Sequence, residues 1–226
     1  MTDDYESRRK KDDKDEKIVG QFLDKYFYPT WSTTTTRNTD VATQITGLDI
    51  TATGFNNVTY TIDEKAATHY VGKNLQTFAQ EINTLDKTGR YRIGWLFDDN
   101  STSEYLVEVW IDNINTPFLD YNTDITDATV TLIKKSDLYQ YLYSKARKED
   151  YINLSNDIRN RGYMYHQGYN YDYYYLSDLR IIVQKYYRER AANVLIPRNI
   201  LVDSLATYSV RIVNHKPIVI KNKLHA

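Results

Sequence analysis

The sequence predicts an α/β (α+β) fold in which a central mixed β-sheet is flanked by helices. Apolar residues recur at helical spacing near the N-terminus and again over residues 136–148. Two β-patterned runs enclose a Gly/Asn turn at residues 54–57, which is typical of a hairpin. More strand-like runs follow this hairpin. Hairpins mixed with single helices are typical of this class.

Composition excludes several kinds of protein. The 226 residues are enough for one sizeable core, or for one core with an appended lobe. Because the chain has no cysteine, it has no disulfide, thiolate zinc site, iron–sulfur cluster or cysteine nucleophile. It has no run of about 18 apolar residues that would span a membrane. The charged N-terminus is not a signal peptide, so we expect a cytoplasmic protein with no membrane partner.

The N-terminal part of the sequence predicts a tail, then a helix, then a segment that is either a loop or an edge strand. Residues 1–15 carry charges of both signs and no apolar periodicity, so we expect a flexible tail. Residues 16–28 predict an amphipathic helix that ends at Pro29. Trp31–Asp40 contains four successive threonines and fits either a loop or an edge strand.

The middle of the chain predicts one helix and three strands. Leu75, Phe78, Ala79 and Ile82 have helical spacing, so we expect a helix over residues 74–84. Residues 91–97, 104–111 and 129–133 predict strands, with Trp95 and Trp110 in the core. Asp98 and Asp99 are interpreted as turn residues and not as metal ligands.

The C-terminal part predicts a basic, Tyr-rich helical extension. We expect helices over residues 136–148, with Ser136 as N-cap, and over residues 176–193. A short helix around 200–205 precedes a strand over 208–220, in which Pro217 favours an edge position. This organisation places a core at residues 16–135 and the extension at 136–226, packed together as one compact domain.

Three charged side chains are predicted to share one sheet surface. Side chains alternate along a strand, so Asp63 and Lys65 point to one face and Glu64 to the other. A turn near Asn56 places Asp49 opposite or diagonal to Asp63, roughly 5–7 Å away between Cβ atoms. Two carboxylates at that distance repel each other unless a cation lies between them. Oxygen ligands suit Mg²⁺ or Mn²⁺, and a neighbouring lysine suits phosphodiester hydrolysis.

The order Asp49, then Asp63-Glu64-Lys65, resembles the PD-(D/E)xK nuclease superfamily, whose fold is restriction-endonuclease-like. The resemblance covers residues 16 to about 110, and Leu48 stands where the family has proline. It implies a Mg²⁺-dependent deoxyribonuclease. Asp49 and Asp63 would bind the ion with the main-chain carbonyl of Glu64, and Lys65 would act on the attacking water.

The resemblance also implies lesser roles near the site. In some members of that family an acid on the first helix binds the metal, for which Glu16 is best placed here, and the family often has a polar residue from the next helix in the site, for which Gln80 and Glu81 are the candidates. Gln44, on the approach to the first strand, is interpreted as a residue that contacts nucleic acid or braces the site. The alternative for each is a solvated helix or loop residue without a role. For Asp63-Glu64-Lys65 the alternative is a solvated strand end.

The segment 163–175 contains seven tyrosines and has basic residues on both sides. Aromatic rings stack on bases and cations meet phosphates, so the segment is predicted to bind nucleic acid. The tyrosines alternatively pack the protein's own core. Residues 131–226 have a charge balance of +8 and residues 1–130 a balance of −9. The predicted nucleic-acid-binding residues are Arg159, Arg161, Tyr169, Tyr171, Arg180, Lys185 and Arg188.

These observations predict DNA as the partner, leave RNA open as a substrate, and are compatible with a homodimer. Two other hypotheses remain at this stage. One is a catalytically inactive nucleic-acid-binding or assembly protein on the same scaffold. The other is an interaction module whose Tyr-rich surface meets another protein.

Overall fold

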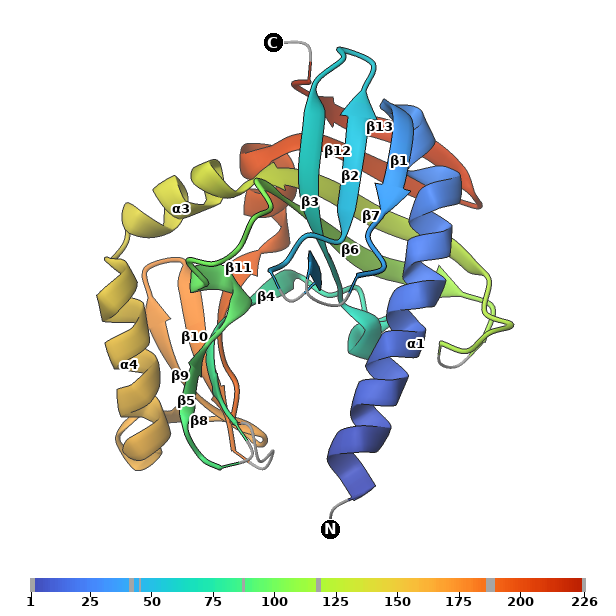
Figure 1. Ribbon diagram of the computed structural model, residues 1–226. Coiled ribbons are helices and arrows are strands. Elements are labelled where there is room, and N and C mark those ends of the chain that lie inside the picture. The colour runs from blue at the N-terminus through green and yellow to red at the C-terminus, as the bar shows by residue number, and fades with distance from the viewer. Residues whose placement is uncertain are drawn as a thin grey trace. The chain divides into compact units, whose positions relative to one another are not determined.

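A computed structural model describes residues 3–40, 43–44, 46–86, 88–116, 119–185 and 190–224. The chain divides into two compact units, each with its own β-sheet (Figure 1). The first unit comprises residues 1–75, 102–134 and 205–226, and the second comprises residues 76–101 and 135–204. The mixture of helices and sheets confirms the broad α+β class.

The first unit contains a seven-stranded mixed sheet and one long helix, α1 (Asp3–Tyr26). β3 and β6 run parallel, and all other pairings between the described strands of this sheet are antiparallel. In spatial order the strands are β1 (Ser32–Arg37), β2 (Ile50–Gly54), β3 (Thr59–Ala66), β6 (Tyr105–Ile114), β7 (Ile125–Lys134), β12 (Ala206–Val213) and β13 (Lys216–Asn222).

Helix α1 covers one face of this sheet (Figure 1). Its buried side chains Phe22 and Leu23 pack with alternate residues of the strands, among them Ile62 and Val107. This alternation sends every second side chain to the opposite face of the sheet. Residues 3–15, expected to be a flexible tail, form the first half of α1. Short helices η1 (Tyr28–Thr30) and η2 (Thr68–Tyr70) follow α1 and β3.

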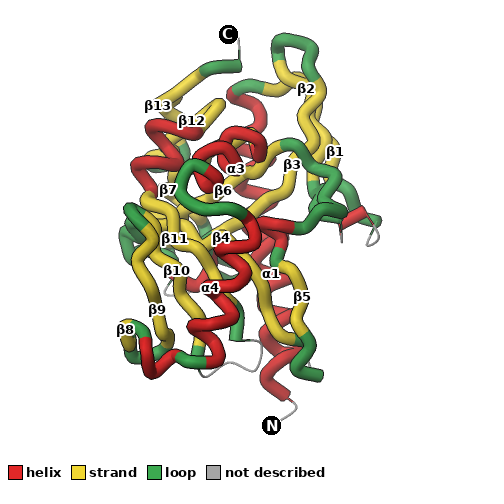
Figure 2. The backbone as a smooth tube through the Cα atoms, turned by 90° about the vertical axis from the view of Figure 1, so that its left-hand side faces the viewer, coloured by secondary structure: helices red, strands yellow, loops and turns green. Residues whose placement is uncertain are grey.

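The second unit contains a six-stranded sheet with helix α4 (Lys148–Asn160) packed on one face (Figure 2). Helix α3 (Lys135–Tyr143) precedes α4. In spatial order the strands are β5 (Tyr91–Ile93), β4 (Thr77–Leu85), β11 (Ala192–Pro197), β10 (Leu179–Gln184), β9 (Tyr171–Leu176) and β8 (His166–Gln167). The short helices of this region are η3 (Trp95–Phe97), η4 (Gly162–Met164) and η5 (Ile200–Leu205).

Two predicted helices are wrong. Residues 74–84 lie largely in β4, and residues 176–193 contain β10, a connection and the start of β11. In β10 the buried residues are Leu179, Ile181 and Val183, which alternate along the strand. Short runs of β-branched residues satisfy both helical and strand spacing, and long-range pairing decides between them. The Tyr-rich segment is therefore largely β-structure, and the predicted helical extension is not observed.

Other elements agree with the sequence. The hairpin of β2 and β3 is confirmed by the pairing of Ile50 with Ile62. Thr-rich β1 and Pro217-containing β13 are the two edge strands of the first sheet. The expected helix at 136–148 is shorter, since α3 ends at Tyr143, and Ser136 lies inside it rather than at its cap. Trp110 is buried, whereas Trp95 is half-buried.

The two units differ less in net charge than the two parts of the sequence do. The first unit has 15 Lys/Arg and 18 Asp/Glu, a balance of −3, and the second has 14 and 12, a balance of +2. The strong asymmetry along the sequence is weakened, because the basic C-terminal strands return to the first unit. Among the described helices, none is long and apolar enough to cross a membrane.

Candidate active site

The acidic pair lies at the end of the β2–β3 hairpin. The Asp49 N–H donates to the Ile62 carbonyl over 2.9 Å, which extends the antiparallel ladder beyond Ile50. Asp49 therefore lies beside Ile62 at the end of the paired segment, close to Asp63. The Asp49 carboxylate also accepts a 2.8 Å hydrogen bond from the Glu64 N–H. That bond ties the Asp49 side chain to β3, an inner strand of the sheet.

Asp63 and Lys65 form an ion pair on the face of the sheet opposite to α1. The Lys65 Nζ lies 2.5 Å from Asp63 Oδ1. Asp63 is 1% exposed, while Ile62 points into the core under α1. The structure thus brings together the three side chains that sequence analysis singled out.

Burial and neighbouring charges shift the pKa values of Asp49 and Lys65. Burial raises the pKa of the Asp49 carboxyl to about 7. The positive charge of Lys65 opposes this rise, and the negative charge of Asp63 adds to it. Burial by itself lowers the pKa of the Lys65 ammonium, but Asp63 and Asp49 outweigh it, so that pKa stands above its ordinary value. Two carboxylates share one ammonium, and a proton or another cation is needed to balance them.

The donor set fits a magnesium ion in chemistry. Mg²⁺ is usually held by one or two carboxylates and keeps several waters, and Asp49 and Asp63 supply two. The N–H and C=O of a strand residue point to the same neighbour, so the Glu64 carbonyl also faces the strand that leads from Asp49. The described residues contain no cluster of three or more His, Cys, Asp or Glu side chains suited to a metal.

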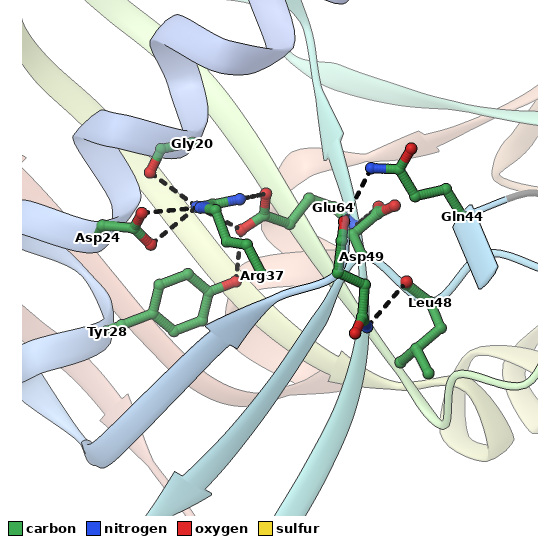
Figure 3. A network of polar contacts seen from close by, with 9 residues as sticks. Gly20, Asp24, Tyr28, Arg37, Gln44, Leu48, Asp49 and Glu64 are labelled. Atoms are coloured by element: carbon green, nitrogen blue, oxygen red, sulfur yellow. Dashed lines mark hydrogen bonds and ion pairs between the residues drawn. The ribbon is translucent and has the colours of Figure 1, made fainter. Parts of the chain in front are cut away.

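The Glu64 side chain lies on the α1 face, where Arg37 holds it (Figure 3). Arg37 Nη1 is 2.7 Å from Glu64 Oε2, and the Tyr28 hydroxyl donates to Glu64 Oε1 over 2.5 Å. The same guanidinium contacts Asp24 at 2.7 Å and the Gly20 carbonyl at 2.7 Å, both on α1. We call Arg37, Glu64, Asp24 and Tyr28 the Arg37 clamp. It links α1, β1 and β3 directly behind the acidic pair.

Gln44 supports the approach to Asp49 (Figure 3). Its amide donates to the Asn38 carbonyl over 3.0 Å, and the Asn38 side chain donates to the Leu48 carbonyl over 3.1 Å. The Asn38 N–H donates to the Asp49 carbonyl over 2.8 Å. Gln44 therefore acts on Asp49 through Asn38 and contributes no side-chain contact to the acids among the interactions described.

Of the other predicted site residues, Glu16 lies in the first unit with the acidic pair, whereas Gln80 and Glu81 lie in the second unit. Glu16 on α1 contributes to the raised pKa of Lys65, so its charge acts on the site. Gln80 and Glu81 are on strand β4 of the second unit, not on a helix. Gln80 is buried in that unit's sheet and pairs with Val194, while Glu81 pairs with Asn193.

Sequence reasoning missed Glu108. It is fully buried on β6 and stands in parallel register with Lys65, on the same face of the sheet. The signal was present, because Glu108 is an acid inside the apolar run 106–111, and charge buried without compensation is costly. Arg37 was also missed, since only the tertiary fold brings β1 and α1 to Glu64.

Some of the predicted nucleic-acid-binding residues are engaged by partners within the protein, and others lie exposed or half-buried at its surface. Arg159 is 4% exposed and donates to Asn83, Asn156 and the Arg190 carbonyl, so its guanidinium is engaged inside the second unit. Arg161 pairs with Asp157, and Lys185 pairs with Asp172 at 2.7 Å. Tyr169 is exposed, whereas Tyr171 and Arg180 lie half-buried on a sheet face. Arg188 lies outside the described residues.

Comparison with known proteins identifies no family for this chain. No protein-family model, no curated protein and no solved structure matches it.

Proposed function

We propose that this protein is a Mg²⁺- or Mn²⁺-dependent nuclease that hydrolyses phosphodiester bonds in DNA. The observation that carries the proposal is the convergence of Asp49, Asp63 and Lys65 on one face of a mixed sheet. Asp63 stands on inner strand β3 and Asp49 directly precedes inner strand β2, an arrangement similar to the one that the resemblance to the PD-(D/E)xK superfamily implies. The two carboxylates beside one ammonium support the proposal independently of that resemblance, because a proton or a metal ion would balance the second negative charge.

Each side chain has a distinct role in this proposal. Asp49 and Asp63 present oxygen ligands, and the Glu64 N–H orients the Asp49 carboxylate. The Lys65 ammonium, held by Asp63, orients the attacking water and donates to a phosphate oxygen. The bound ion would lower the pKa of a water and neutralise charge on the phosphoryl group. The water oxygen bonds to phosphorus, one phosphorus–ester oxygen bond breaks, and the leaving oxygen takes a proton.

The direct test is incubation of the full chain with linear, circular and single-stranded DNA, and with RNA, in Mg²⁺, Mn²⁺ or EDTA. We expect metal-dependent cleavage of DNA. Asp63→Asn and Lys65→Ala should each lower the rate at least about 100-fold, the scale of losing one electrostatic group at a reacting centre. Circular dichroism checks that both variants stay folded.

Asp99→Asn is the matched control for Asp63→Asn. Asp99 is a surface acid of the second unit, paired with Lys148, and its substitution should leave the rate unchanged. Full activity in Asp63→Asn, or equal cleavage in EDTA, contradicts the proposal. DNA binding without cleavage under every condition would instead favour the catalytically inactive nucleic-acid-binding protein.

A further inference from the structure

One face of the second sheet carries a ladder of aromatic rings. Tyr171, Tyr173 and Tyr175 alternate along β9 and so point to the same face. Their rings meet edge to face, with centroids 5.8 Å apart for the first pair and 5.5 Å for the second. His166 on β8 stacks on Tyr173 with centroids 5.2 Å apart. These four residues are defined here as the ring ladder.

The ring ladder lies on the face opposite to helix α4. Asn83 donates to Ser155 of α4 over 2.7 Å, so Asn83 marks the α4 face. Across the sheet, Asn83 on β4 pairs with Ala192 on β11, and Ala192 pairs with Val183 on β10, so Val183 also marks the α4 face. Tyr173 on β9 pairs with Ile182, the neighbour of Val183 on β10. Neighbours along a strand point to opposite faces, so Ile182 and the ring ladder point away from α4.

A cation accompanies the rings. The Arg180 guanidinium lies 5.7 Å from the ring centroids of both Tyr171 and Tyr173. Arg180 makes no ion pair with any carboxylate of the residues that the structure describes. Its charge therefore remains available for a phosphate, unlike the charges of Lys185 and Arg161.

The spacing of the rings favours unpaired bases. The ring centroids are 5.8 and 5.5 Å apart, well above the ~3.4 Å between stacked bases of one strand in a duplex. Bases that are separated and splayed match this ladder one base to one ring, whereas the bases of a duplex are stacked on each other and out of reach.

We infer that the ring ladder and Arg180 form a binding platform for single-stranded nucleic acid. The rings take the bases and Arg180 takes a phosphate between them. Stacking accepts any base, so the platform has little sequence preference. The inference concerns the second unit alone and holds whether or not the first unit hydrolyses phosphodiesters.

Fluorescence anisotropy of the full chain with a labelled single-stranded 20-mer, in EDTA to prevent metal-dependent cleavage, tests the platform. Each stacked base contributes about 1–3 kcal/mol, so Tyr173→Ala should weaken binding about 5- to 150-fold. Tyr173→Phe keeps the ring and should bind like the parent. Arg180→Gln should weaken binding and flatten the salt dependence, by about 0.7 in the slope of log affinity against log salt.

Tyr174→Ala is the matched control, since Tyr174 is the next residue on β9 and packs edge to face with Tyr165 on the α4 face. It should bind like the parent. Equal affinity for the duplex of the same sequence would overturn the inference, as would an unchanged affinity in Tyr173→Ala. Binding of the ring ladder to a polysaccharide or a protein, with no affinity for the 20-mer, would also overturn it.

Discussion

Replacing Arg37 by alanine is predicted to destabilise the first unit more than its exposure suggests. The substitution removes the contacts of 2.7 and 3.3 Å to Glu64, those of 2.7 and 2.9 Å to Asp24, and the 2.7 Å bond to the Gly20 carbonyl. The Glu64 side chain is only 14% exposed and would keep the Tyr28 hydroxyl as its partner in the Arg37 clamp.

The magnitude follows from the two ends of the Arg37 clamp. Stranding a buried charge costs about 3–5 kcal/mol, and we take about 2–3 kcal/mol because the Arg37 side chain is 32% exposed and water reaches it. The Asp24 end is 43% exposed and contributes about 0.2–1 kcal/mol. The free energy of unfolding should therefore fall by about 2–4 kcal/mol, which corresponds to roughly 4–16 °C in Tm for a chain of this size.

Urea denaturation followed by tryptophan fluorescence measures this loss, because Trp31 and Trp110 are buried in the first unit. Asp24→Ala is the reference for the exposed end and should cost at most about 1 kcal/mol. Adding Glu64→Gln to Arg37→Ala removes the stranded charge and should restore part of the lost stability. If Arg37→Ala costs no more than Asp24→Ala, or if Glu64→Gln restores nothing, the reasoning about the stranded carboxylate is refuted.

Three further predictions concern other sites. Because Asp49 has a pKa of about 7 in the folded state against an ordinary value of 3.8, the folded state holds the extra proton between about pH 4 and 7. In metal-free buffer the free energy of unfolding should therefore fall as pH rises through that window. Asp49→Asn should remove this dependence on pH, and a variant with the same pH dependence as the parent contradicts the prediction. Arg159→Ala leaves buried Asn83 without its cationic hydrogen-bond donor, so the free energy of unfolding measured by urea denaturation should fall by about 1–3 kcal/mol. A fall of less than about 0.5 kcal/mol contradicts this prediction. Leu23→Ala empties a fully buried position under the sheet and should cost about 2–5 kcal/mol, and a surface-like cost would contradict the described core.

Local patterns in the sequence predicted the hairpin and the face relation of its charges. Alternation along a strand is a property of the backbone, so Asp63 and Lys65 had to share a face once residues 59–66 formed a strand. The Gly/Asn turn set the pairing of Ile50 with Ile62, which brings Asp49 close to Asp63. Trp110 could be assigned to the core for the same reason, as an aromatic residue in an alternating apolar strand.

The tertiary structure decided everything that depends on partners distant in the chain. β4 and β10 have apolar spacings that fit a helix as well as a strand, and their pairing with β11, β5 and β9 makes them strands. The same pairing sends residues 76–101 and 135–204 into one unit. Glu108 beside Lys65 and Arg37 beside Glu64 are contacts between separate elements, which no local period encodes. The sequence by itself determined which side chains alternate, whereas long-range strand pairing determined which of them meet.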